Sequence, residues 1–61
     1  MKVNIEMTTI YVFENALLGD DGDQWKAALI DQHTADTDEA CLAWAAEKYD
    51  VNDYTSSFTA P

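Results

Sequence analysis

The first pattern in the chain runs from Val3 to Phe13, where apolar side chains recur at every second position apart from Thr9. This spacing predicts a β-strand with one apolar face, and the β-branched and aromatic residues within it favour a sheet. Ile10 and Val12 occupy the alternate positions and break the pattern. We therefore expect the second half of the strand to be covered on both faces, or to meet a partner.

The next stretch, Asn15 to Asp23, is predicted to be a loop because it contains two glycines and an Asp-Gly dipeptide. Trp25 to Ile30 fits two patterns. The alternation there indicates a strand, whereas helical spacing with Asp23 as N-cap is the other interpretation. We favour the strand, since two apolar runs joined by a Gly/Asp loop form a hairpin readily.

The strongest helical pattern covers Thr37 to Tyr49. Asp36 is placed to cap it, with Glu39 three residues later as in a capping box. Asp38 in the first turn and Lys48 in the last both favour the helix dipole. The predicted buried stripe consists of Cys41, Leu42, Ala45 and Tyr49.

Alternation returns from Tyr54 to Phe58 and predicts a last short strand, with Pro61 closing its edge. The resulting fold class is α+β, a ββαβ arrangement in which one helix packs across a small, mainly antiparallel sheet. Residues 1–61 are expected to form a single domain.

Charge narrows the possible functions. Twelve carboxylates face three lysines and no arginine, so the formal net charge is −9 and the sequence pI about 4.1. This excludes direct binding of nucleic acid, which needs Lys and Arg, and disfavours acidic membranes. No leader pattern or long apolar run is visible, so we expect a cytoplasmic protein, in the host cell if a phage encodes it.

Catalytic and metal-binding side chains are sparse. The single His33 and single Cys41, with no serine before Ser56, make a nucleophile and base hard to assemble. We predict no enzymatic activity, cofactor or metal, with Cys41 as a small buried residue and His33 in a solvated loop. The acidic residues from Asp20 to Asp23 fit no EF-hand register, and weak divalent-cation binding stays an open alternative.

An acidic surface of this size can replace nucleic acid in a basic groove. Nine charges correspond to about 15 Å of duplex, or about four to five base pairs. Carboxylates two apart on a strand or three apart on a helix also have spacings near those of successive phosphates. The candidate partner-binding residues are Asp20, Asp21, Asp23, Asp31, Asp36, Asp38, Glu39, Glu47, Asp50 and Asp53.

In length, acidity and lack of a catalytic motif, the chain resembles small phage inhibitors of host nucleases, including anti-restriction and anti-CRISPR proteins. It is most similar to anti-CRISPRs that block DNA binding by a type I surveillance complex, and is also similar to uracil-DNA glycosylase inhibitors. The resemblance implies a DNA mimic that evades host defence through protein–protein interaction with a basic nucleic-acid-binding partner.

The alternative is a small acidic interaction domain without mimicry, for which a homodimer formed through the Ile10/Val12 face or through Trp44 is one form. Salt distinguishes the two hypotheses, since screening weakens electrostatic docking and leaves an apolar dimer intact.

Overall fold

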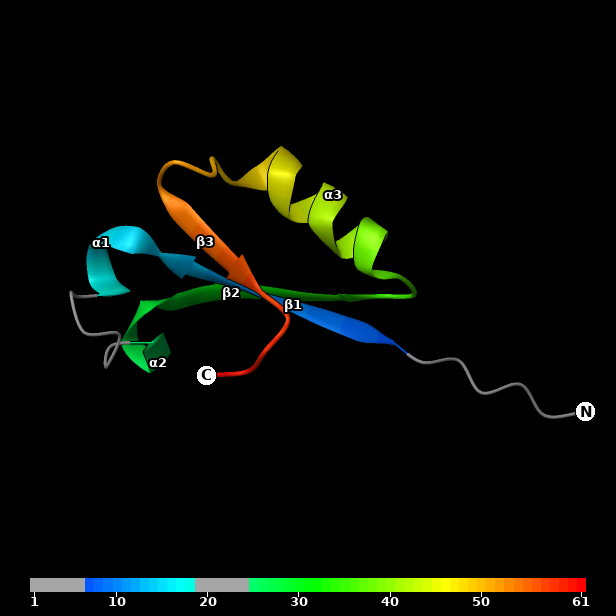
Figure 1. Ribbon diagram of the computed structural model, residues 1–61, viewed down its shortest axis with the longest axis horizontal. Coiled ribbons are helices and arrows are strands. Elements are labelled where there is room, and N and C mark those ends of the chain that lie inside the picture. The colour runs from blue at the N-terminus through cyan, green and yellow to red at the C-terminus, as the bar shows by residue number, and fades with distance from the viewer. Residues whose placement is uncertain (1–6, 19–24) are drawn as a thin grey trace, which may run out of the picture.

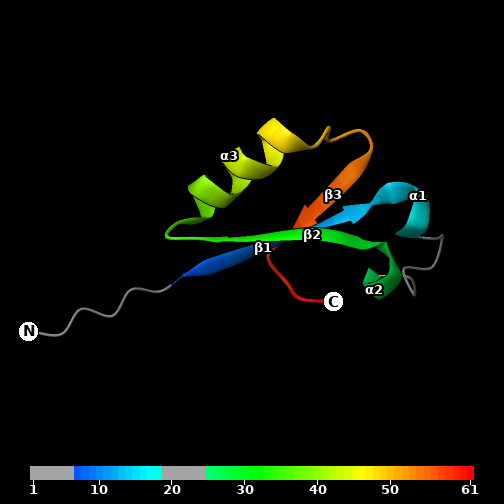
Figure 2. The same ribbon diagram turned by 180° about the vertical axis from the view of Figure 1, so that it is seen from behind.

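The computed structural model describes residues 7–18 and 25–61, and its elements confirm the α+β class. In chain order these are β1 (Thr8–Glu14), α1 (Asn15–Leu18), α2 (Trp25–Ala28), β2 (Leu29–Ala35), α3 (Asp38–Lys48) and β3 (Tyr54–Ser57). The three strands form one antiparallel sheet in the order β2-β1-β3, and α3 lies across one face of it (Figure 1). The view from behind shows α1 and α2 together at the other end of β2 from α3 (Figure 2).

The central strand β1 pairs on both sides. Its register with β2 runs from Thr8 opposite Ala35 to Phe13 opposite Leu29, with an irregularity between Val12 and Phe13. On its other side, residues 11–14 pair with β3. The predicted pairing of the first two strands is therefore confirmed, and the first four residues of the predicted first strand lie outside the described residues.

The position of the second strand was predicted wrongly. Trp25–Ala28 is a single helical turn, and the strand begins only at Leu29. The helical turn places Trp25 edge-on to Phe13, with ring centroids 4.8 Å apart, and buries Ala28. Burial of Phe13 and Ala28, together with the contact of Trp25 on Phe13, outweighs the weak local alternation that suggested a strand. The predicted loop after β1 also begins with a short helix, α1.

The long helix α3 matches its prediction closely, but its cap is one residue later than expected. Thr37 has extended backbone angles, and its hydroxyl accepts a hydrogen bond from the Ala40 amide at 3.1 Å. Thr37, rather than Asp36, thus satisfies an amide that the first turn leaves unpaired. At the other end the Tyr49 amide donates to the Ala45 carbonyl at 2.8 Å.

The core lies between α3 and the sheet. Ile10 and Val12 of β1 pack against Cys41 and Ala45 of α3, and all four side chains are buried. The small residues on the helix let it approach the strands closely. Cys41 is buried as predicted, and its thiol donates to the Thr8 carbonyl at 3.4 Å.

Leu42, expected on the buried stripe, is instead 49 % exposed. The reason is the position of α3, which contacts β1 and β2 and so leaves the Leu42 side of the helix uncovered. Ile10 and Val12 are fully covered by α3, so the face they form is not available for the predicted dimer contact. Trp44 packs partly buried against the same core.

The opposite face of the sheet is covered only locally. Phe13 is buried there beside Trp25, so β1 is covered on both faces at this point, as its sequence indicated. Phe58 follows β3 rather than ending it and is exposed, and Pro61 lies near Phe13 and Trp25 rather than at the edge of the strand. None of the helices in the described residues is long and apolar enough to cross a membrane.

Candidate functional site

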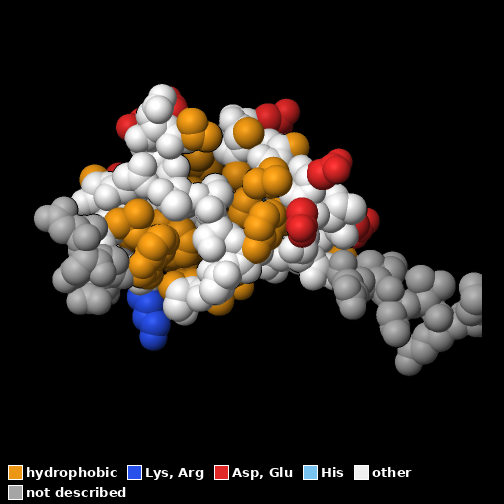
Figure 3. Space-filling view, viewed as in Figure 1, with side chains coloured by type: hydrophobic (Ala, Val, Ile, Leu, Met, Phe, Trp, Pro, Cys, Tyr) orange, Lys and Arg blue, Asp and Glu red, His pale blue; other side chains and the backbone are white. Residues whose placement is uncertain are grey.

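Carboxylates gather along α3 and the segments on either side of it. Figure 3 shows them along the upper and right-hand outline of the molecule, over this helix and its flanks. All of them are exposed to solvent. This acidic face is made by Asp36, Asp38, Glu39, Glu47, Asp50 and Asp53.

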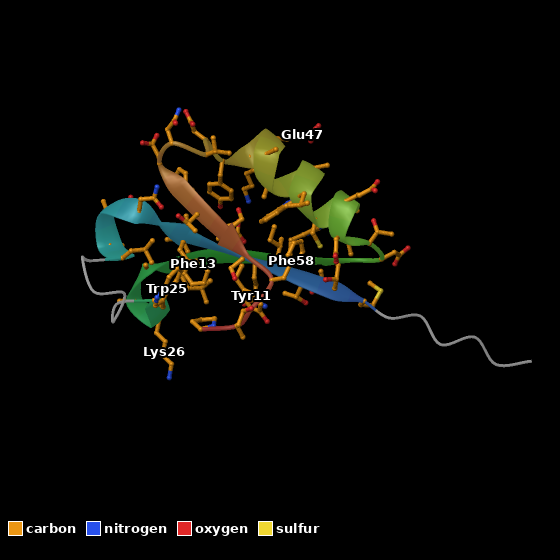
Figure 4. The ribbon with its side chains drawn as sticks, in the orientation of Figure 1. Tyr11, Phe13, Trp25, Lys26, Glu47 and Phe58 are labelled. Atoms are coloured by element: carbon orange, nitrogen blue, oxygen red, sulfur yellow. The ribbon has the colours of Figure 1, made fainter. Side chains whose placement is uncertain are left out.

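The geometry of α3 explains why the acidic face points outward. Cys41 and Ala45 face the sheet, and helical periodicity of 3.6 residues places Glu39 and Glu47 toward the opposite side. Figure 4 shows Glu47 on the side of α3 away from the sheet. The 11 residues of α3 extend over about 16 Å. The acidic face is therefore about as long as four to five base pairs of duplex.

The turn that follows α3 is held by hydrogen bonds. The amides of Asp53 and Tyr54 both donate to the Asp50 carbonyl at 3.0 Å, and the Asn15 amide donates to the Asp53 carbonyl at 3.0 Å. The Asn52 amide also donates to the Asp50 carboxylate at 2.8 Å. These contacts give Asp50 and Asp53 defined positions at the C-terminal end of the acidic face.

Positive charge is kept away from the acidic face or neutralised beside it. The Lys48 ammonium lies 2.9 Å from the Asp31 carboxylate, forming an ion pair. Lys26 is on α2, at the far side of the molecule from α3, and points into solvent (Figures 3 and 4). Residues 7–18 and 25–61 contain no lysine or arginine other than these two lysines.

Asp31, one of the candidate partner-binding residues, makes contacts within the protein. It lies on β2 facing α3, where it accepts hydrogen bonds from the Tyr49 hydroxyl at 2.6 Å and from Lys48. The Tyr49 bond, followed by the Lys48 bond, lowers the pKa of Asp31 from 3.8 to about 2. The same contacts raise the pKa values of Lys48 and Tyr49. Asp31 therefore connects β2 to α3 and does not belong to the acidic face.

His33 was expected in a solvated loop, and this prediction was wrong. It lies on β2, half-buried, with its ring stacked on Trp44 at a centroid distance of 4.6 Å. Lys48 completes this group, with its ammonium 5.4 Å from the centre of the Trp44 ring. Sequence reasoning missed the contact because His33 lies between polar neighbours and has no apolar alternation around it.

No three acidic, histidine or cysteine side chains converge on a possible metal position in the part of the chain that the structure describes. The Cys41 thiol also contacts the backbone carbonyl of His33, at 3.8 Å, and not its imidazole. The predictions of no activity, no cofactor and no metal remain predictions. Asp20, Asp21 and Asp23 lie outside the described residues, so their position relative to the acidic face stays open.

Comparison with known proteins adds no functional assignment. No protein-family model, curated protein or solved structure matches the chain. Function must therefore be argued from the surface of this protein itself.

Proposed function

We propose that the protein is an inhibitor that binds the basic nucleic-acid-binding surface of a host defence complex and competes with DNA there. The observation that carries this proposal is the acidic face, in which exposed carboxylates lie at both ends of α3 and in the segments that flank it. Its charge has the sign and approximate extent of a short piece of duplex. The type I CRISPR surveillance complex, suggested by the resemblance, is the first target to test.

The positions of the cations support the proposal. Lys48 is paired with Asp31, and Lys26 is remote from α3, so neither offsets the charge of the acidic face. A surface with one sign of charge speeds association with a partner of opposite sign and repels nucleic acid. The protein would compete with DNA because both would bind the same basic groove of the partner.

The proposed test measures target-DNA binding by a purified type I surveillance complex with and without the protein. A first variant combines Asp38→Asn, Glu39→Gln and Glu47→Gln on α3. A second variant of equal charge combines Asp20→Asn, Asp21→Asn and Asp23→Asn, the other group of candidate partner-binding residues, so each variant changes the formal charge from −9 to about −6. Circular dichroism confirms that both remain folded.

We expect the α3 variant to lose at least about tenfold in inhibition, mainly through slower association, and the loss to shrink as salt rises. Single substitutions should have small effects, since exposed charge pairs contribute about 0–1 kcal/mol each. Equal losses from both variants would show that the carboxylates of α3 contribute no more than those of Asp20, Asp21 and Asp23. Undiminished inhibition by the folded α3 variant would exclude mimicry.

A second candidate is an interaction domain without mimicry, and the exposed apolar side chains beside α3 favour it. Leu42 and Val51 are 49 % and 79 % exposed. In this case binding should hold or strengthen at high salt, and the charge variants should bind normally.

A further inference from the structure

An apolar groove runs between α3 and β3, next to the acidic face. Because α3 packs over β1 and β2, it leaves the near side of β3 uncovered. Tyr54 and Ser56 line the groove from β3, and Leu42 and Ala46 line it from α3. The groove has a volume of about 470 Å³, and Val51 lies at the end where α3 turns into β3.

The rim of the groove is acidic at both ends. Asp38 and Glu39 lie four and three residues before Leu42, on neighbouring positions of the helix surface. At the other end, a second hollow shares Ala46 and Val51 with the groove and is lined by Glu47 and Asp50. In Figure 3 apolar side chains show in the region of α3 and β3, with carboxylates around them.

We propose that this groove binds a segment of a basic protein in which a large apolar side chain is flanked by lysine or arginine. This inference rests on the proposed function and deepens it, since such a segment would belong to the same basic partner. The apolar side chain fills the space between Leu42 and Tyr54. Its cationic neighbours meet the carboxylates at the two ends of the groove.

Charge complementarity selects this occupant over the others. Nucleic acid is repelled by the rim, and a second copy of this chain would bring two surfaces of the same negative sign together. Lys48 also lines the second hollow, but its ammonium is bound to Asp31 2.9 Å away. In a basic segment with one large apolar side chain, that side chain contacts the apolar groove and the neighbouring cations contact the carboxylates at its ends.

The experiment titrates the isotopically labelled full-length protein with short synthetic peptides and follows its backbone amide signals by NMR. The test peptide has one central tryptophan with two lysines on each side. One control peptide replaces the tryptophan with serine, and the other replaces the lysines with glutamates. Each is also titrated into a Leu42→Asn, Val51→Ser variant, which keeps the formal net charge of −9.

We expect the test peptide to bind at least about tenfold more tightly than either control and to shift signals of residues lining the groove, such as Ala46 and Tyr54. The Leu42→Asn, Val51→Ser variant should lose most of this preference. Both substituted residues are exposed, so the variant should fold normally.

If the serine peptide binds as tightly as the test peptide, charge alone accounts for the binding. If the glutamate peptide binds as tightly, apolar contact alone accounts for it. Either result, or shifts centred on Phe13 and Trp25 instead, would overturn the inference. The proposed function is judged separately by the charge variants in the DNA-competition assay. If those variants lose inhibition while the Leu42→Asn, Val51→Ser variant inhibits normally, mimicry stands and the groove plays no part.

Discussion

The imidazole of His33 lies flat on the indole of Trp44, with ring centroids 4.6 Å apart and planes inclined by 10°. The contact joins β2 to α3 and covers one face of Trp44, which is only partly buried. Together with the hydrogen bonds from Lys48 and Tyr49 to Asp31, it forms a polar and aromatic connection between the edge strand and the helix.

The stacked pair leads to a prediction about stability. His33→Ala should lower the free energy of unfolding by about 1 kcal/mol, because an aromatic pair contributes about 0.5–1.5 kcal/mol beyond its buried area. His33→Phe should recover most of this loss, since its ring can stack in the same place. Urea unfolding followed by tryptophan fluorescence measures both, and equal losses from the two variants would contradict a stacking contribution.

The lowered pKa of Asp31 predicts that the free energy of unfolding depends on pH. Its pKa is about 2 in the folded protein, below its ordinary value of 3.8, so the unfolded chain binds the proton more readily between these values. The stabilisation of the folded protein by ionised Asp31 is therefore present above about pH 4 and is lost as pH falls toward 2. At pH 7, Asp31→Asn should lower the free energy of unfolding by about 1 kcal/mol.

The difference between wild type and Asp31→Asn should shrink as pH falls from 4 toward 2, because the carboxyl becomes protonated first in the unfolded chain and then, near its pKa of about 2, in the folded protein. Asp36→Asn is the control, because Asp36 is exposed and its neutralisation should change stability by less than about 0.5 kcal/mol. A difference that stays constant from pH 7 to pH 2 would show that ionisation of Asp31 does not contribute.

The burial of Cys41 predicts that its thiol is protected from chemical modification. A thiol reagent should react at least about a hundredfold more slowly with the native protein than with the urea-unfolded chain, because reaction requires opening of the core between α3 and β1. The measurement is the rate of thiol release or labelling across a urea series. Equally fast reaction in both states would show that α3 does not cover Cys41.

The cap of α3 predicts unequal effects at neighbouring positions. Thr37→Ala removes the hydroxyl that accepts from the Ala40 amide and should lower the free energy of unfolding by about 1 kcal/mol. Asp36→Ala, which leaves this hydrogen bond in place, should have a much smaller effect. A larger loss from Asp36→Ala, measured by thermal unfolding, would move the cap back to the position that the sequence suggested.

Part of the fold could be predicted because it depends on neighbours in the chain. The helix was placed within one residue at each end, since capping, dipole charges and the spacing of Cys41 and Ala45 are all local. The pairing of β1 with the following strand was also predicted. The position of that strand was not, because Trp25–Ala28 takes its structure from contacts with Phe13 rather than from its own pattern.

In the candidate site too, some features could be predicted from the sequence and others depend on the tertiary structure. The acidic character of the chain and the carboxylates on α3 are visible in the sequence. The sequence did not show that Asp31 is bound by Tyr49, a residue 18 positions away, or that Leu42 lies at the edge of an open groove. Both depend on where α3 crosses the sheet.

By itself, then, the sequence determined the α+β class, the limits of α3, the burial of Cys41 and the sign of the surface charge. The tertiary structure decided which carboxylates stay free, where the polar strand Leu29–Ala35 pairs and which side of α3 remains open. The physical reason is the distance along the chain between the residues that interact. Periodicity, caps and charge are properties of short segments, whereas burial and ion pairing depend on residues that only folding brings together.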